Sequence, residues 1–144
     1  ESTKSIAHNG MKNWGYRLNE QFRLLAEPFL LIGEIENGVR RLLHGKFTQA
    51  ELASAKAPGD DGRQIETPAD LTFGEYIRLV EQEQSWRKLK IEIDRATFVA
   101  QLNRVRDIRN DVMHFDPDGL GDEDLTFLRE FAQFLKRLRE IGVA

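Results

Sequence analysis

The stretch RLLAEPFLLIGEIENGVRRLL, residues 23–43, decides the fold class. Apolar residues recur in and around it at steps of three and four, which places them on one face of an α-helix. Pro28 lies inside this run, lacks a backbone donor and disfavours helical geometry at Glu27, so we expect either two helices or one bent helix. The apolar positions are Leu18, Phe22, Leu25, Phe29, Ile32, Ile35, Val39, Leu42 and Leu43.

The rest of the chain also favours helices. A short helix is predicted within 47–55, a capping box at Thr72–Glu75 opens the next helix, and residues 85–89 add one more turn. Asp94 is expected to cap a helix that runs to Met113, and Asp122 a last helix that runs to about Ile141. No stretch has the alternation of a strand, so the sequence predicts an all-α fold, a four- to five-helix up-and-down bundle.

The remaining segments are expected to connect or flank this bundle. Residues 1–14 are polar and are interpreted as a linker or tail, which leaves a single domain over 15–144. Residues 56–70 carry two prolines and two glycines with almost nothing apolar, so a mobile surface loop is expected. The segment Asp116–Gly119 is typical of a turn. Because the chain begins with Glu1, we expect it to be a piece of a longer polypeptide.

The composition of the chain restricts the classes of function and of partner that we expect. The net charge is −3, whereas a domain that binds nucleic acid by general electrostatics is basic, so any RNA contact must be local or transient. The chain has no cysteine, which excludes disulfides and thiolate sites and fits a cytoplasmic protein. Its apolar runs are too short to span a bilayer, and no membrane partner is expected. The three scattered histidines, and an acidic segment at 116–124 that does not fit a calcium loop, predict neither a metal site nor a cofactor.

The segment RNDVMHF at 109–115 holds the candidate site. On a helical wheel, Arg109 falls within the apolar sector of the 94–113 helix, which is marked by Phe98, Leu102, Val105 and Val112. A buried arginine cannot lose its charge and needs an anion, and Glu36 is the best candidate within the chain. One interpretation is purely structural: Arg109–Glu36 is a buried interhelical ion pair, and His114 caps a helix C-terminus.

The other interpretation comes from a resemblance. Arg109-Asn110 followed by His114 resembles the Arg-x4–6-His signature of the HEPN superfamily, and residues 33–43 resemble an acidic helix found earlier in several HEPN groups. The phrases at 23–43, 71–81 and 106–118 resemble, in order, the HEPN-like domain that follows paired CBS domains in bacterial proteins. This resemblance implies a four-helix core, a bacterial protein with CBS domains elsewhere in its chain, and a possible toxin-like RNase.

The implied activity is metal-independent cleavage of RNA by its own 2′-hydroxyl. His114 would transfer protons, because the ordinary pKa of an imidazole lies near ~6.5. Arg109 would hold the phosphate oxygens, and Asn110 would orient the imidazole or the substrate. Glu36, Arg40 and Asp111 are expected to support the site or bind substrate, although aspartates near His114 would repel phosphate.

The same resemblance implies a homodimer that brings two signatures together. One imidazole per chain cannot readily make both proton transfers, and a partner subunit would explain an arginine on an apolar face. Two alternatives stay open: a non-catalytic dimerisation or regulatory module of a CBS-containing signalling protein, and a helical scaffold in which the motif is coincidental.

Overall fold

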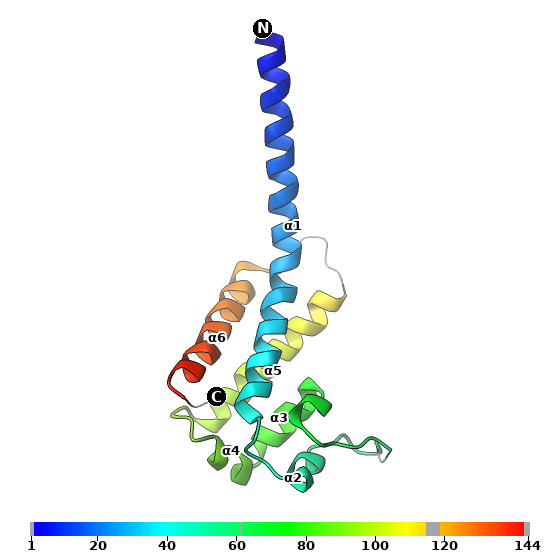
Figure 1. The fold of residues 1–144 in the computed structure, drawn as a ribbon, viewed down its shortest axis with the longest axis vertical. Coiled ribbons are helices and arrows are strands. Elements are labelled where there is room, and N and C mark those ends of the chain that lie inside the picture. Colours follow the sequence, from blue (N-terminus) through cyan, green and yellow to red (C-terminus); the bar gives the residue numbers. More distant parts are fainter. Residues whose placement is uncertain (1, 61, 115–118, 143–144) are drawn as a thin grey trace.

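The chain folds into an all-α helical bundle (Figure 1). The computed structural model describes residues 2–60, 62–114 and 119–142, with side chains from residue 19 onward, and this part contains helices and no strand. The predicted helical bundle is confirmed, and the short segments predicted within 47–55 and at 85–89 form helices of their own, so this part of the chain contains six α-helices. The helices are α1 (Ser2–Leu43), α2 (Gln49–Ser54), η1 (Pro68–Asp70), α3 (Phe73–Glu81), α4 (Glu83–Leu89), α5 (Arg95–Met113) and α6 (Asp122–Glu140).

Helix α1 is one rod of 42 residues, about 63 Å long, whose N-terminal half extends beyond the bundle (Figure 1). It begins at Ser2, although the sequence indicated no helical period before residue 15, and it runs through Pro28 without ending. Of the two alternatives predicted for Pro28, two separate helices are therefore excluded, and a single helix forms. Pro28 removes one backbone bond, to the carbonyl of Leu24, and buried side chains one and two turns further on, Ile32 and Ile35, hold the helix in place.

The core lies around the second half of α1. This helix packs on α6 and α5, and α3 packs on α5. The predicted apolar face of α1 is buried from Ile32 onward but not before it, since Phe22, Leu25 and Phe29 are exposed. The side chains that fill the centre come from α1, α3, α4, α5 and α6; they are Ile35, Val39, Leu42, Leu43, Tyr76, Leu79, Val80, Leu89, Phe98, Leu102, Val105 and Leu128.

Helices α1 and α6 meet at a glycine. A Cβ atom placed on Gly38 would lie 3.0 Å from Cδ1 and 3.2 Å from Cβ of Leu135, so the absence of a side chain allows this close crossing. Leu128, Phe131, Leu135 and Leu138 form the buried face of α6. Helix α6 ends at Glu140, one residue before the predicted Ile141, which is the C-cap residue and is exposed.

Local capping agrees with most of the predicted helix starts. The carboxylate of Asp94 accepts a hydrogen bond of 3.1 Å from the N–H of Thr97, and Thr72 and Glu75 form the predicted capping box. Asp122 does not cap α6: Gly121 occupies the N-cap position, and Asp122 is the first helical residue. Its carboxylate still favours the helix, because acidic groups in the first turn oppose the positive end of the helix dipole.

The connection 56–70 is anchored to α3 by a buried carboxylate. Glu75 is 2% exposed and accepts hydrogen bonds from the N–H of Ala57 (2.6 Å), from the N–H of Thr72 (2.9 Å) and from the guanidinium of Arg63. Ile65, the one large apolar residue of this segment, is buried. Much of the segment is therefore held against the bundle by Glu75 and Ile65.

Glu75 makes the stability of the fold depend on pH. Burial alone would raise the pKa of this carboxyl, but the hydrogen bonds from Thr72, Arg63 and Ala57 outweigh burial and lower the pKa from 4.5 to about 2. A lowered pKa in the folded state gives stability that is fully present above pH 4.5 and is lost as the pH falls towards 2. Replacing Glu75 with Gln should cost about 2 kcal/mol at pH 7.

Chemical denaturation of wild type and Glu75→Gln between pH 7 and pH 2.5 tests this expectation. The difference in the free energy of unfolding should shrink as the pH falls below 4.5. Glu83→Gln is a matched control, because Glu83 forms an exposed ion pair with Arg87 within α4. A constant difference between wild type and Glu75→Gln over the whole range would contradict the assignment.

Candidate functional site

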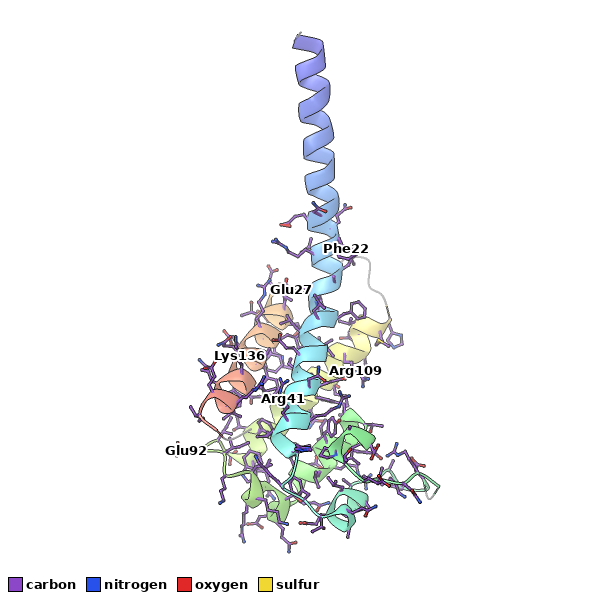
Figure 2. All side chains as sticks on the ribbon, viewed as in Figure 1. Phe22, Glu27, Arg41, Glu92, Arg109 and Lys136 are labelled. Carbon is purple, nitrogen blue, oxygen red and sulfur yellow. The ribbon has the colours of Figure 1, made fainter. Side chains whose placement is uncertain are left out.

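Arg109 lies where α5 passes α1, at the edge of the core (Figure 2). Its Nε atom is 3.1 Å from Oε1 of Glu36, and the two side chains are 41% and 19% exposed. The predicted partner is therefore confirmed, but the predicted burial is wrong. Ile108 takes the buried place in the last turns of α5, and the long side chain of Arg109 reaches the surface.

Glu36 connects Arg109 to a second arginine. Nη2 of Arg40 lies 3.8 Å from Oε2 of Glu36, while Nε of Arg40 donates a hydrogen bond of 2.8 Å to the hydroxyl of Tyr76. Nη1 of Arg40 donates to Oδ1 of Asn37 at 2.9 Å. A polar chain thus leads from Tyr76 in the core, through Arg40 and Glu36, to Arg109 at the surface.

Tyr76 fixes the inner end of this chain. It is 1% exposed, and its burial raises the pKa of the hydroxyl, although the hydrogen bond from Arg40 acts in the opposite direction. A neutral hydroxyl in the core, held by the packing of α3, gives Arg40 a fixed anchor. Arg40 in turn contributes positive charge beside Glu36, so this carboxylate lies between two guanidinium groups.

His114 and Asn110 lie on the exposed side of the last turns of α5. Both residues are exposed, and Met113 between them is 61% exposed. They are four residues apart and so point in similar directions, whereas His114 lies about 140° round the helix from Arg109. Among the described residues, no hydrogen bond or ion pair joins His114 to Arg109. One chain therefore brings Arg109, Glu36 and Arg40 together but leaves His114 separate.

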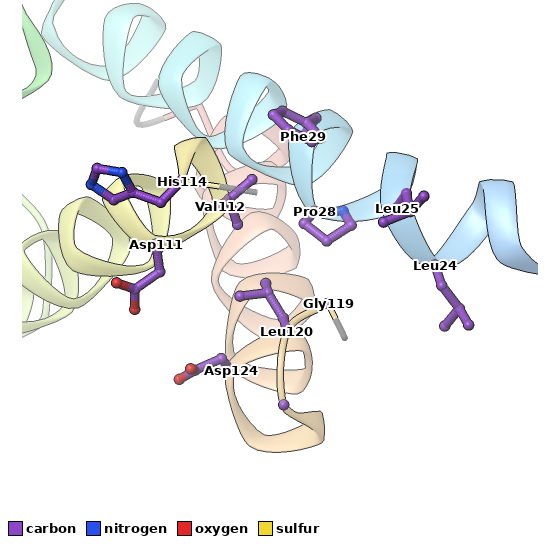
Figure 3. A pocket seen from close by; sticks show the side chains of 11 residues that line it. Leu24, Leu25, Pro28, Phe29, Asp111, Val112, His114, Gly119, Leu120 and Asp124 are labelled. Atoms are coloured by element: carbon purple, nitrogen blue, oxygen red, sulfur yellow. The ribbon is translucent and has the colours of Figure 1, made fainter. Parts of the chain in front are cut away.

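His114 and Asp111 border a pocket that sequence analysis missed (Figure 3). The pocket has a volume of about 370 Å³ and lies between α1, the end of α5 and the start of α6. The imidazole and the carboxylate of Asp111 point in different directions at its border (Figure 3). Its apolar lining includes Leu24 and Leu120, which lie outside the predicted apolar helix faces. Apolar residues that no predicted helix face explains were the sequence feature that could have indicated this pocket. The remaining lining residues are Leu25, Pro28, Phe29, Val112, Gly119, Gly121 and Asp124.

His114 also ends α5. Its backbone N–H bonds to the carbonyls of Asp111 and Val112, as at a helix C-terminus. The turn predicted at 116–119 lies outside the described residues except for Gly119, whose φ of +75° suits glycine. The structural interpretation of His114 as a C-cap residue therefore agrees with the structure, while its side chain stays exposed.

Two further properties of the described residues bear on function. Among the side chains that the structure describes, within 19–60, 62–114 and 119–142, no three acidic or histidine groups come together in a way that could bind a metal ion. In the same part of the chain, none of the helices has the length and apolar character needed to cross a bilayer.

Comparison of the chain with protein-family models, with curated proteins and with solved structures found no match.

Proposed function

We propose that this domain is a HEPN-like, metal-independent endoribonuclease whose site is completed by a second copy of the chain. The observation that carries the proposal is the accessible guanidinium of Arg109, which Glu36 fixes at the surface on the helix that also presents Asn110 and His114. A fixed, exposed arginine fork can bind the non-bridging oxygens of a phosphodiester.

The reaction needs a proton acceptor, a proton donor and positive charge near phosphorus. A ribose 2′-hydroxyl loses its proton and attacks the adjacent phosphorus, and the bond to the 5′-oxygen breaks as that oxygen gains a proton. The products are a 2′,3′-cyclic phosphate and a free 5′-hydroxyl. His114 makes one proton transfer, and His114 of the second copy makes the other.

A second copy is also needed because one chain does not bring Arg109 and His114 together. Arg109 and His114 point about 140° apart on α5, so the two groups of a single chain cannot easily act on the same phosphate. A two-fold arrangement can place Arg109 of one copy near His114 of the other. Asn110, which projects to the same side as His114, is suited to orient the imidazole or a base.

Arg109→Ala tests the proposal. RNA cleavage should be seen in EDTA with wild type and should fall about 100-fold or more in the variant, as expected when a donor to a developing charge is removed. The measurement is the rate of cleavage of end-labelled single-stranded RNA, with identification of the cyclic phosphate product.

Arg129→Ala is the matched control. Arg129 is also a half-exposed arginine in an ion pair, with Glu27, but it lies on α6. Its replacement should leave cleavage unchanged, and an RNA with a single 2′-deoxy sugar at the cleaved position should resist wild type. Equal activity of wild type and Arg109→Ala would contradict the proposal.

A second candidate function is a non-catalytic dimerisation or regulatory module, attached to CBS domains in a bacterial, cytoplasmic signalling protein. The observation that favours it is electrostatic: Glu36 already neutralises Arg109, and Asp111 and Asp124 border the pocket beside His114. Both features weaken phosphate binding. The absence of RNA cleavage by a dimeric wild type would favour this function.

A further inference from the structure

Helix α1 makes two interhelical pairs between a glutamate and an arginine, and their geometry differs. Glu27 uses both carboxylate oxygens: Nε of Arg129 donates to Oε1 at 2.7 Å, and Nη2 donates to Oε2 at 2.9 Å. Glu36 meets Arg109 through Oε1, which lies 3.1 Å from Nε. The first pair is here called closed. The second is called open, because within the described part of the chain no hydrogen bond engages Nη1 or Nη2 of Arg109.

Arg40 accounts for the open pair. Its Nη2 atom lies 3.8 Å from Oε2 of Glu36, the oxygen that a closed pair would turn towards Arg109. An arginine and a carboxylate commonly pair through two parallel contacts when both oxygens are free. Because Arg40 attracts Oε2, only Oε1 meets Arg109. The residue four positions after Glu27 is Leu31, so no cation stands at the same place beside the closed pair.

The nitrogens of Arg40 are all engaged within the chain. Nε donates to the hydroxyl of Tyr76 at 2.8 Å, and Nη1 donates to Oδ1 of Asn37 at 2.9 Å. Nη2 faces Glu36, as described above. The side chain is 40% exposed, yet it has no edge left for a bidentate contact with a ligand. Arg40 therefore fits a positioning role, whereas Arg109 fits a binding role.

The core fixes the hydroxyl that anchors Arg40. Tyr76 is 1% exposed, and its ring meets that of Phe73 edge to face, with centroids 6.1 Å apart and ring planes at 75°. Buried rings in a close-packed core have little freedom to shift. The hydroxyl of Tyr76 is thus a fixed point on α3 that holds the guanidinium of Arg40 beside Glu36.

The open edge of Arg109 suits one class of ligand. A guanidinium presents its Nη1 and Nη2 atoms as a planar fork that matches two oxygens of a phosphate group. The side chain of Arg109 is 41% exposed, so this fork can be reached from solvent. The guanidinium keeps its charge at any working pH.

We propose that Tyr76 and Arg40 are positioning residues that keep Arg109 open, so that its Nη1 and Nη2 atoms can bind a phosphodiester. The choice of a phosphodiester rests on the proposed function, whereas the positioning acts within one chain and needs no second copy. Loss of the hydroxyl of Tyr76 frees Arg40 to move. Oε2 of Glu36 then turns towards Arg109, and the pair closes over part of the fork.

A double-mutant cycle between Tyr76→Phe and Glu36→Gln tests this proposal. The probe is a 2′-deoxy trinucleotide, which carries phosphodiesters but no 2′-hydroxyl, so binding is measured without cleavage. The measurement is a titration of the Nε–H signal of Arg109 by NMR. Tyr76→Phe keeps the ring and the charge, and it should weaken binding about 5–10-fold, as expected for coupled residues of one network. When Glu36→Gln is also present, the effect should fall below about twofold, because no carboxylate remains to close the pair.

Two further variants sharpen the cycle. Ser85→Ala removes another buried hydroxyl, on α4, and should leave binding unchanged. Equal weakening by Tyr76→Phe with and without Glu36→Gln would mean that the hydroxyl does not act through Glu36, and it would overturn the proposal. A loss of binding by Arg40→Gln that persists together with Glu36→Gln would show that Arg40 binds the phosphate itself, and no binding by wild type would remove the site.

Failure of the nuclease and failure of the positioning role are distinguishable. Trinucleotide binding that follows the cycle, in a wild type that does not cleave RNA, would support the positioning role and contradict the nuclease. RNA cleavage by wild type, with trinucleotide binding that Tyr76→Phe does not change, would support the nuclease and overturn the positioning role.

Discussion

RNA cleavage should fall by at least 100-fold in His114→Ala, the largest effect on rate that we expect from a single substitution. General acid–base catalysis by a positioned side chain contributes about 10²–10⁴-fold, and alanine can neither accept nor donate a proton. In the shared site, both proton transfers would be lost together, since each copy carries the same substitution. The rate should be measured on single-stranded RNA in EDTA, with the folded state checked by circular dichroism.

His44→Ala separates this role from any general effect of losing a histidine. His44 is also exposed at a helix end, just after α1, but it lies far along the chain from α5. Its replacement should leave the rate within a factor of two or so of wild type. A mixed dimer of wild-type and His114→Ala chains should also lose most of the activity, because the shared site then keeps only one of its two imidazoles. Unchanged cleavage by His114→Ala would end the catalytic assignment of this residue.

Phe98→Ala should lower the free energy of unfolding by about 3–5 kcal/mol, the largest effect on stability that we expect. The side chain is 0% exposed, and its ring centroid lies 5.3 Å from that of Trp86 and 5.9 Å from that of Phe131. Truncation leaves a cavity where α4, α5 and α6 meet. Urea denaturation should show the loss as a lower midpoint with a similar slope.

Phe127→Ala provides the comparison for the core substitution. Phe127 is half-buried, stacks on Phe131 at 5.8 Å and lies under the guanidinium of Arg104 at 4.2 Å. Its loss should cost only about 1 kcal/mol, because much of its surface already contacts water. Similar destabilisation by both variants would mean that the aromatic cluster is not centred on Phe98.

The pairing of Glu36 with Arg109 is a tertiary contact that the helical periodicity of the sequence was sufficient to predict. On the helical wheel, Arg109 falls within the apolar sector of its helix and Glu36 lies beside that of α1, and a charged group in such a place needs a counter-charge from the neighbouring helix. The contacts from Arg40 to Tyr76 could not be predicted in this way. They depend on the depth to which α3 inserts beside α1, and no local pattern encodes that distance.

By itself, the sequence determined the helical fold class, most helix boundaries and the caps at Asp94 and Thr72. These features depend on residues within about four positions of each other, so the periodicity of the chain is sufficient. Tertiary structure alone decided where the apolar face of α1 stops being buried. Phe22 and Ile32 follow the same spacing, yet Phe22 is 73% and Ile32 7% exposed, because α5 and α6 cover only the second half of α1. Packing between helices likewise carried α1 through Pro28 and left Arg109 at the surface, since burial is set by neighbours that lie far away in the sequence.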